Sequence, residues 1–222
     1  MKQPFWKRLY SYVDDVLIEQ LEGEHNEELH VLLSQGRYQL CTEHAIYSFA
    51  DKYDNFKLFF DQLDWEKYEI DSVLVLGLGL ASIPFMLEKQ GKRFHYTAVE
   101  IDENVVYLAN KYVLEELESP VEVLIGDAHQ FMLMNKRKFD LVVMDVFVDD
   151  VVPQKFRSTQ FMSRLEDAMK PGGLAMYNLL NQTQGDKKDA EEFYEIFKGN
   201  LPGAEYKDIK GNKMLYYQKP KV

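Results

Sequence analysis

Residues 73–82, Val-Leu-Val-Leu-Gly-Leu-Gly-Leu-Ala-Ser, and residues 99–102, Val-Glu-Ile-Asp, decide the fold of this chain. The first stretch has the pattern of a buried strand that runs into a glycine turn and then a helix, and the second that of a strand ending in an acid. Gly77 allows a sharp turn, and Gly79 lets the backbone approach a ligand closely because it has no Cβ. Glu100 follows Gly79 by about 20 positions, where a carboxylate can accept hydrogen bonds from both ribose hydroxyls. The sequence therefore predicts a nucleoside site in an α/β sheet.

Strand and helix patterns alternate regularly on the C-terminal side of this stretch. The predicted strands cover residues 73–76, 94–100, 121–125, 139–145 and 174–179. Two helices are predicted to begin at the caps Ser82 and Asp102, and three more are predicted over residues 128–135, 158–169 and 188–198. Pro171-Gly172-Gly173 is expected to end the helix at 158–169. A terminal hairpin is expected over residues 205–209 and 213–217. This pattern predicts an α/β fold: a Rossmann-like, mainly parallel sheet with helices on both faces and an antiparallel C-terminal edge hairpin.

The N-terminal part of the chain has a different pattern. Strand-like runs cover residues 15–21, 29–33 and 37–41, with turns at residues 24–26 and 34–36, and residues 46–65 have a largely helical pattern. Three strands are too few to bury a core alone. The sequence therefore predicts a small N-terminal β-rich domain over residues 1–50, followed by a Rossmann-like nucleoside-binding catalytic domain over residues 51–222.

The composition limits the possible functions. The chain has 222 residues, 46% of them hydrophobic, and a formal charge of −11 from 26 basic and 37 acidic residues. This charge disfavours nonspecific binding to nucleic acid or to an anionic membrane, and it is compatible with a cationic substrate. No run approaches the roughly 18 apolar residues that a membrane-spanning helix needs. We therefore expect a cytoplasmic enzyme with no nucleic-acid or membrane partner.

Cysteine and histidine positions argue against a metal site. Cys41 is the only cysteine, which excludes an internal disulfide and a zinc site built from several thiolates. The five histidines do not cluster with carboxylates at the spacing of metal ligands. We expect no metal.

Acidic residues fall at the carboxyl ends of the predicted strands, where open parallel sheets bind ligands. Besides Glu100 and the neighbouring Ile101, Asp127 and Ala128 follow the third strand, and Asp145 ends the fourth. A dinucleotide dehydrogenase would explain the glycines and Glu100, but not the other two acids. Asp127 can accept a hydrogen bond from the exocyclic amino group of adenine, cap the next helix, or do both. The set fits the nucleoside end of S-adenosylmethionine or a derivative better.

Residues 70–180 resemble the class I S-adenosylmethionine-dependent methyltransferase fold. Within it, the chain most resembles the spermidine synthase (polyamine aminopropyltransferase) family and its spermidine-synthase-like relatives. The stretches that carry the resemblance are residues 75–79, 98–102, 125–128, 139–145 and 161–178. The N-terminal strands also resemble the β-rich N-terminal domain of that family, with Tyr47 where the family has a substrate-facing tyrosine.

The resemblance implies a transferase that moves an aminopropyl group from an S-adenosylmethionine-type donor to an amine. It implies S-adenosylmethionine or its decarboxylated form as co-substrate, no metal, and a homodimer or higher homo-oligomer with the N-terminal strands at the interface. Asp145 and Tyr47 would be catalytic, and Asp149 and Asp150 would bind the acceptor. The donor would contact Gly77, Gly79, Glu100, Ile101, Asp127 and Ala128.

Two positions depart from the family pattern. Leu80 stands where aminopropyltransferases carry an aspartate in the glycine loop, and Val148 stands where they carry a second aspartate after Asp145. Two alternatives therefore remain open: methyl transfer from S-adenosylmethionine to a small acceptor, and a non-catalytic nucleoside-binding protein. Tyr47 could serve only in packing, and Asp149 and Asp150 could be solvated loop charges.

Overall fold

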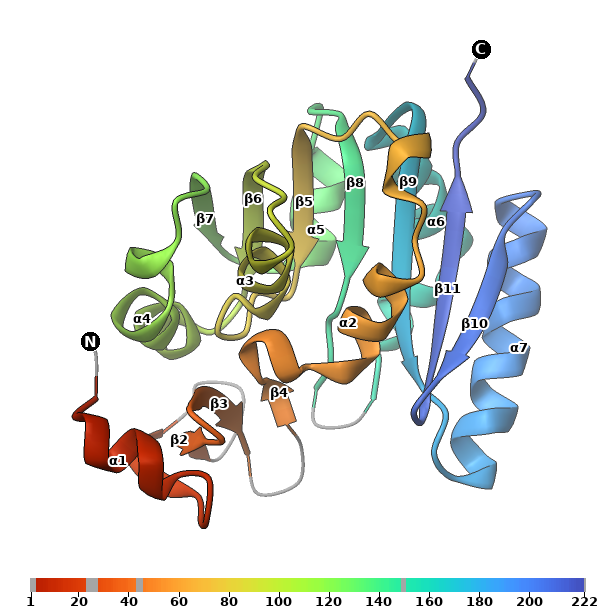
Figure 1. Ribbon diagram of the computed structural model, residues 1–222. Coiled ribbons are helices and arrows are strands. Elements are labelled where there is room, and N and C mark those ends of the chain that lie inside the picture. Colours follow the sequence, from red (N-terminus) through yellow and green to blue (C-terminus); the bar gives the residue numbers. More distant parts are fainter. Residues whose placement is uncertain (1–2, 23–27, 43–45, 149–150, 222) are drawn as a thin grey trace.

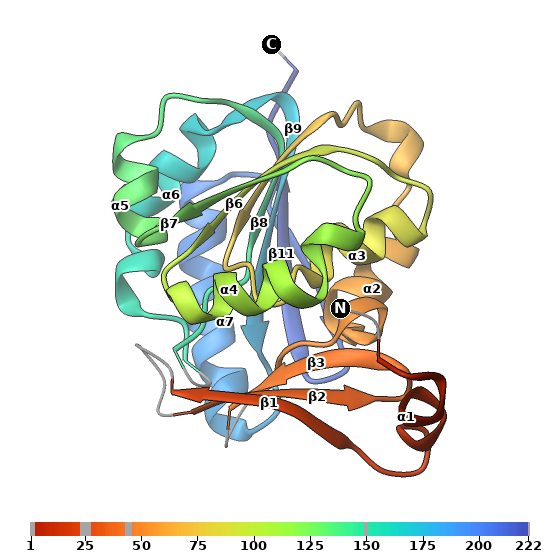
Figure 2. The same cartoon turned by 90° about the vertical axis from the view of Figure 1, so that its left-hand side faces the viewer.

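The computed structural model describes residues 3–22, 28–42, 46–148 and 151–221. A short helix, α1 (Phe5–Tyr10), precedes a four-stranded antiparallel sheet in the order β1-β2-β3-β4, which lies beside the larger sheet in Figures 1 and 2. Its strands are β1 (Val16–Glu22), β2 (Glu28–Ser34), β3 (Arg37–Cys41) and β4 (Ile46–Ser48). The predicted N-terminal strands are thus confirmed. The turn predicted at residues 24–26 lies outside the described residues.

The helix predicted over residues 46–65 is wrong in its first part. Ile46–Ser48 forms strand β4 because its backbone pairs with the free edge of β3, where Cys41 lies opposite Ile46. Ala50 then adopts a left-handed φ of 46°, which interrupts any continuous helix. A single 3-10 turn (Ala50–Lys52) leads into α2 (Asp54–Asp61), and another (Trp65–Lys67) follows it.

The main sheet has seven strands in the order β10-β11-β9-β8-β5-β6-β7. Its strands are β5 (Ser72–Leu76), β6 (His95–Glu100), β7 (Val121–Ile125), β8 (Phe139–Met144), β9 (Met169–Leu180), β10 (Glu205–Ile209) and β11 (Asn212–Gln218). The five strands from β9 to β7 are parallel, whereas β11 pairs antiparallel with β9 and with β10. The chain runs outward from β5 to β7 and returns to β8 on the other side of β5. This reversal places a ligand-binding crevice at the carboxyl ends of β5 and β8.

Helices cover both faces of this sheet (Figure 2), which confirms the predicted fold class. They are α3 (Ser82–Lys89), α4 (Glu103–Tyr112), α5 (Ala128–Met134), α6 (Thr159–Asp167) and α7 (Gln184–Asn200), with 3-10 turns at Leu114–Glu116 and Gln154–Arg157. One buried cluster joins α2, α3 and α4 to the sheet and to β2 and β3, and a second joins α5, α6 and α7 to the opposite face. The N-terminal sheet therefore shares a core with the main domain.

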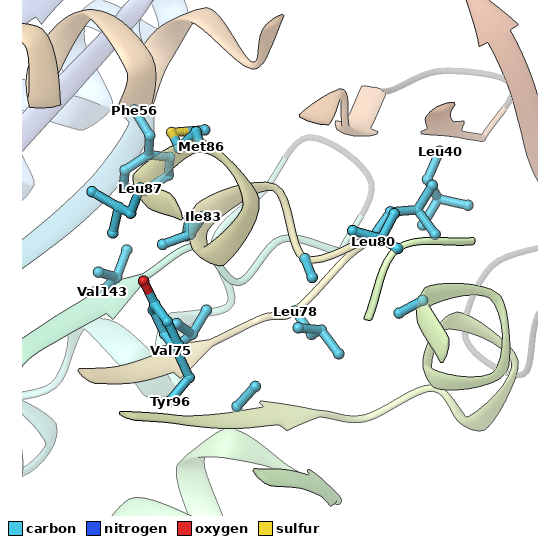
Figure 3. Packing of buried hydrophobic residues seen from close by; sticks show 14 of the residues in the cluster. Leu40, Phe56, Val75, Leu78, Leu80, Ile83, Met86, Leu87, Tyr96 and Val143 are labelled. Atoms are coloured by element: carbon cyan, nitrogen blue, oxygen red, sulfur yellow. The ribbon is translucent and has the colours of Figure 1, made fainter. Parts of the chain in front are cut away.

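Leu80 belongs to the first of these clusters. Its side chain has no exposed surface and packs in the same cluster as Leu40 of β3, with Val75 and Leu87 also in the cluster (Figure 3). Burying a leucine side chain of this kind contributes roughly 1.5–3 kcal/mol to folding. Position 80 is thus part of the core that joins the two sheets.

Two predicted helix boundaries differ from the structure. Ala81, in a left-handed conformation with φ of 55°, occupies the N-cap of α3, and Ser82 is the first helical residue. The Ser82 hydroxyl instead pairs with the Ser48 hydroxyl at 2.6 Å. Helix α6 ends at Asp167, and residues 171–173 lie inside β9, because Gly172 N–H donates to the Lys219 carbonyl at 2.9 Å. The Pro-Gly-Gly segment therefore forms an irregular start of a strand and not the end of the helix.

Candidate functional site

A cavity of about 820 Å³ opens at the carboxyl ends of the parallel strands. Its wall includes every predicted site residue that the structure describes: Tyr47, Gly77, Gly79, Glu100, Ile101, Asp127, Ala128 and Asp145. Asp149 and Asp150 lie outside the described residues. The N-terminal β4 and the C-terminal hairpin also contribute to the wall, through Tyr47 and Asn212. The cavity thus combines residues from both sheets.

The glycine turn brings the ends of β5 and β8 into contact. Gly77 has a φ of 86°, and a Cβ at this position would lie 2.3 Å from the backbone oxygen of Asp145. A Cβ on Gly79, whose φ is 52°, would lie 3.1 Å from the Tyr47 carbonyl oxygen. Both glycines therefore allow a close approach of the chain's own backbone, β8 in one case and β4 in the other.

Glu100 holds the glycine turn against the end of β6. Its Oε2 accepts hydrogen bonds from the N–H groups of Leu78 at 3.0 Å and Gly79 at 3.3 Å. Its Oε1 accepts from the N–H groups of Ile101 at 2.8 Å and Asp102 at 3.2 Å. Burial raises the pKa of the Glu100 carboxyl, although these four donors favour its charged form. The cap of α4 is Asp102, which accepts from Asn104 N–H at 2.8 Å.

Asp127 caps α5 and binds a lysine that the sequence analysis did not single out. Its Oδ1 accepts from the N–H groups of His129 at 2.7 Å and Gln130 at 3.3 Å, and its Oδ2 pairs with the Lys155 ammonium. Burial alone would raise the pKa of Asp127, but Lys155 and the two backbone donors together hold this pKa below its ordinary value. Asp127 is therefore a carboxylate that joins α5 to the 3-10 turn after β8.

Asp145 is the central titratable group of the cavity. Its Oδ1 accepts a hydrogen bond from Asn178 Nδ2 at 2.9 Å, and Tyr53 also hydrogen-bonds to its carboxylate. Burial raises the pKa of Asp145 to about 7; the bonds from Asn178 and Tyr53 lower it, and the Glu100 charge raises it further. A carboxyl group that titrates near neutral pH can accept a proton from a bound substrate.

Tyr53, which the sequence analysis did not propose as a site residue, contacts Asp145. Tyr47 lies in β4 and lines the cavity, while the Tyr53 hydroxyl hydrogen-bonds to Asp145 from just before α2. Burial and the Asp145 charge raise the pKa of Tyr53 well above its ordinary value, so that Tyr53 is neutral and can donate. No local sequence pattern indicates this contact or the contact of Asn178, because both depend on how distant segments meet.

The pKa of Asp145 makes stability depend on pH in a defined direction. Between about pH 4 and pH 7 the folded protein keeps a proton on Asp145 that the unfolded chain has released, so this group reduces stability as the pH rises through that window. We expect the free energy of unfolding of Asp145→Asn, relative to that of wild type, to be roughly 1–3 kcal/mol higher at pH 8 than at pH 4.5. Urea unfolding of both proteins at the two pH values measures this gain. A difference between the proteins that does not change with pH would contradict it.

Two kinds of feature are not found in the described parts of the chain. Within residues 3–22, 28–42, 46–148 and 151–221, no three His, Cys, Asp or Glu side chains come together in a way that could hold a metal ion. Over the same ranges, no helix is both long enough and apolar enough to cross a bilayer.

Comparison with known protein families gives a clear match over most of the chain. The model of the family described as "Spermine/spermidine synthase domain" matches residues 66–204. The chain belongs to this family. The matched segment contains Gly77, Gly79, Glu100, Asp127 and Asp145, whereas Tyr47 and Tyr53 precede it. Membership places the chain in a family of transferases of the aminopropyltransferase and methyltransferase type.

Individual relatives of the chain are distant. A probable polyamine aminopropyl transferase of Bifidobacterium longum is 27% identical over 155 residues, which cover 68% of this chain and 34% of that protein. An eEF1A lysine and N-terminal methyltransferase homolog of Drosophila melanogaster is 28% identical over 154 residues, which cover 65% of this chain and 23% of that protein. The chain thus spans about a third or less of the length of these two relatives.

The fold is close to that of a solved spermidine synthase. The crystal structure of spermidine synthase from Thermotoga maritima superposes with a TM-score of 0.71 at 14% identity, covering 93% of this chain and 74% of that chain. Coverage this high includes both the small N-terminal sheet and the seven-stranded sheet. At this identity the likeness establishes the fold alone.

Proposed function

We propose that this spermidine synthase family member transfers an aminopropyl group from decarboxylated S-adenosylmethionine to an amine. The observation that carries the proposal is the position of Asp145, a half-buried carboxyl with a pKa of about 7, beside a glycine turn and Glu100 in one cavity. A nucleoside site next to a proton acceptor is what this reaction needs. The match to the family over residues 66–204 supports the same conclusion.

The reaction is a displacement at carbon. The amine nitrogen attacks the methylene carbon beside the sulfonium; a C–N bond forms, the C–S bond breaks, and its electron pair stays on sulfur as a neutral thioether. Only a neutral amine can attack, so its proton passes to Asp145, whose pKa near 7 suits this transfer. Holding the two reactants in line removes much of the entropic barrier.

The residues proposed as donor contacts all line the cavity. In this proposal Glu100 and Ile101 lie at the ribose, and Asp127 and Ala128 lie at the adenine. Asp127 already caps α5 and pairs with Lys155, so its part in adenine recognition would be shared with those bonds. The acceptor is an amine, and we propose Asp149 and Asp150 for a second ammonium group of a polyamine.

Titration calorimetry with the two donor forms tests the proposed donor. We expect decarboxylated S-adenosylmethionine to bind at least tenfold more tightly than S-adenosylmethionine, a difference of about 1.4 kcal/mol. ATP is a suitable control ligand because it shares the adenosine group but lacks the sulfonium. Absence of binding by both sulfonium compounds would reject the nucleoside site itself.

Methyl transfer from S-adenosylmethionine is the second candidate, and the burial of Leu80 favours it. With no exposed surface, Leu80 packs in the core shared with β3, and the glycine loop therefore presents no carboxylate to the amino group of a decarboxylated donor. The methyltransferase homolog of Drosophila melanogaster supports this candidate as well. A preference for S-adenosylmethionine in the calorimetric titration would select it.

We also propose that the protein forms a homo-oligomer through its N-terminal segment. Helix α1 has no buried residue, and Phe5, Trp6 and Val13 are 81%, 65% and 83% exposed in the single chain. Monomers rarely expose neighbouring large apolar side chains to this extent. Size-exclusion chromatography with light scattering is expected to give at least a dimer for wild type and a smaller species for Trp6→Glu with Val13→Glu. A monomeric wild type would reject the proposal.

A further inference from the structure

A chain of two amide side chains connects the C-terminal hairpin with Asp145. Asn212 Nδ2, at the start of β11, donates to Asn178 Oδ1 of β9 at 2.9 Å, and Asn178 Nδ2 donates to Asp145 Oδ1 at 2.9 Å. The two asparagines are only 9% and 1% exposed, and Asn212 lies beyond the segment that matches the family model. Burying a series of polar groups such as this one costs folding free energy unless each group has a hydrogen-bond partner.

We infer that Asn178 and Asn212 are positioning residues that keep one oxygen of Asp145 occupied as a hydrogen-bond acceptor. The proton that the amine substrate loses then goes to the other oxygen of Asp145. This inference rests on the proposed function, because it concerns the proton that an amine loses during transfer. Asn178 acts on Asp145 directly, and Asn212 acts only through Asn178.

The direction of the hydrogen bonds follows from the chemistry of the amide group. An asparagine can present either its oxygen or its NH₂ group to a neighbour. Since Asn212 donates to the oxygen of Asn178, the NH₂ group of Asn178 is turned toward Asp145. If both amide groups were turned round, the Asn178 oxygen would face Oδ1 of Asp145. That contact would need a proton on Oδ1. The observed direction therefore suits the carboxylate form and leaves protonation to the other oxygen.

Several groups around Asp145 oppose or favour its charge. Glu100 of β6 disfavours the carboxylate, as burial does, while Tyr53 and Asn178 favour it by hydrogen bonding. The lysines that line the same cavity are Lys52, Lys155 and Lys210, which bond to Gln35, Asp127 and Asp54. Loss of the Asn178 amide would therefore leave burial and Glu100 less opposed, and the pKa of Asp145 would rise above about 7.

Titration of the Asp145 carboxyl in the substrate-free protein tests this inference. We propose ¹³C NMR of aspartate-labelled protein, with the Asp145 signal assigned from its absence in Asp145→Asn. Leucine has nearly the shape of asparagine without its hydrogen bonds, so Asn178→Leu should raise the midpoint by about one pH unit. Asn212→Leu should raise it less, and the double variant should shift it no further than Asn178→Leu alone.

Asn181→Ala is the matched control, since Asn181 follows the same strand but bonds to Asp208 at 2.9 Å and should leave the midpoint in place. Where product forms, the acid limb of kcat/KM should move with the midpoint while the donor Kd stays constant. An unchanged midpoint in folded Asn178→Leu, or shifts that simply add in the double variant, would overturn the inference. If Asn178→Leu does not fold, Asn212→Leu serves as the test, because it keeps the hydrogen bond between Asn178 and Asp145. An unchanged midpoint in Asn212→Leu would then overturn the inference.

The titration also separates this inference from the proposed function. A raised midpoint together with no product from either donor would uphold the action of the two asparagines on Asp145 and reject the transferase chemistry. Product formation with an unchanged midpoint would uphold the transferase chemistry and reject the action of the two asparagines on Asp145.

Discussion

Asp145→Asn is expected to lower kcat by about a thousandfold while the Kd of the donor changes by less than about threefold. An amide cannot accept the proton of the attacking amine, and a positioned general base typically contributes 10²–10⁴-fold to the rate. Asparagine has nearly the same volume, so the hydrogen bonds from Asn178 and Tyr53 that surround the side chain are perturbed little. Donor binding depends on the glycine turn and Glu100, which this change leaves in place.

Asp61→Asn is the control for this substitution. Asp61 is an exposed carboxylate in α2 that pairs with Lys57 at 2.6 Å and does not line the cavity. Both constants of this variant should equal those of wild type. Equal losses of kcat and donor affinity in Asp145→Asn would show that Asp145 serves to bind the donor and not to take the proton.

Gly77→Ala is expected to destabilise the fold by roughly 3 kcal/mol and to abolish donor binding. The new Cβ would lie 2.3 Å from the backbone oxygen of Asp145, and the φ of 86° at this position is itself unfavourable for alanine. Relief of the clash requires β5 and β8 to separate at the point where the glycine turn and Asp145 meet. For a chain of this size the melting temperature should fall by about 6–12 °C.

Gly91→Ala separates the effect of the steric clash from the effect of the unfavourable φ. Gly91 has a similar φ of 75°, but nothing lies within 4 Å of the Cβ that it would gain. We therefore expect a loss of only about 1 kcal/mol and unchanged donor binding. If Gly77→Ala costs no more than Gly91→Ala in thermal unfolding, the contact between the glycine turn and Asp145 is not as tight as the structure indicates.

Local patterns were sufficient to predict most of the cavity wall. Parallel strands align their carboxyl ends, so recognising the strands at 73–76, 94–100 and 139–145 already placed Gly77, Glu100 and Asp145 at one edge of the sheet. The spacing between Gly79 and Glu100 added the prediction of a ribose-binding carboxylate at that edge. These inferences need only the order of elements along the sequence.

The partners of Asp145 could not be predicted in this way. Asn178 reaches Asn212 because β11 pairs antiparallel with β9 in a register that places Asn212 opposite Leu180, and a single-residue slip would turn these side chains away from each other. Tyr53 reaches Asp145 from the segment between β4 and α2. In the sequence Tyr53 has only the pattern of an apolar helix position.

The errors at residues 46–65 and 171–173 have a related cause. The spacing of Phe56, Phe59 and Phe60 correctly indicated α2, but Ile46–Ser48 became a strand because the edge of β3 was available to it. The Pro-Gly-Gly segment joined β9 because Lys219, nearly 50 residues later, pairs with it. In each case backbone pairing with another segment, Cys41 in β3 for the first and Lys219 for the second, overrode the local preference.

Identification of the sulfur-containing product is the most direct test of the proposed reaction. The protein would be incubated with decarboxylated S-adenosylmethionine or S-adenosylmethionine and a panel of amines, and the products would be measured by mass spectrometry, with Asp145→Asn as the blank. We predict 5′-methylthioadenosine and an amine heavier by one aminopropyl group, formed only from the decarboxylated donor. Formation of S-adenosylhomocysteine and a methylated acceptor, or of no sulfur product from either donor, would contradict aminopropyl transfer.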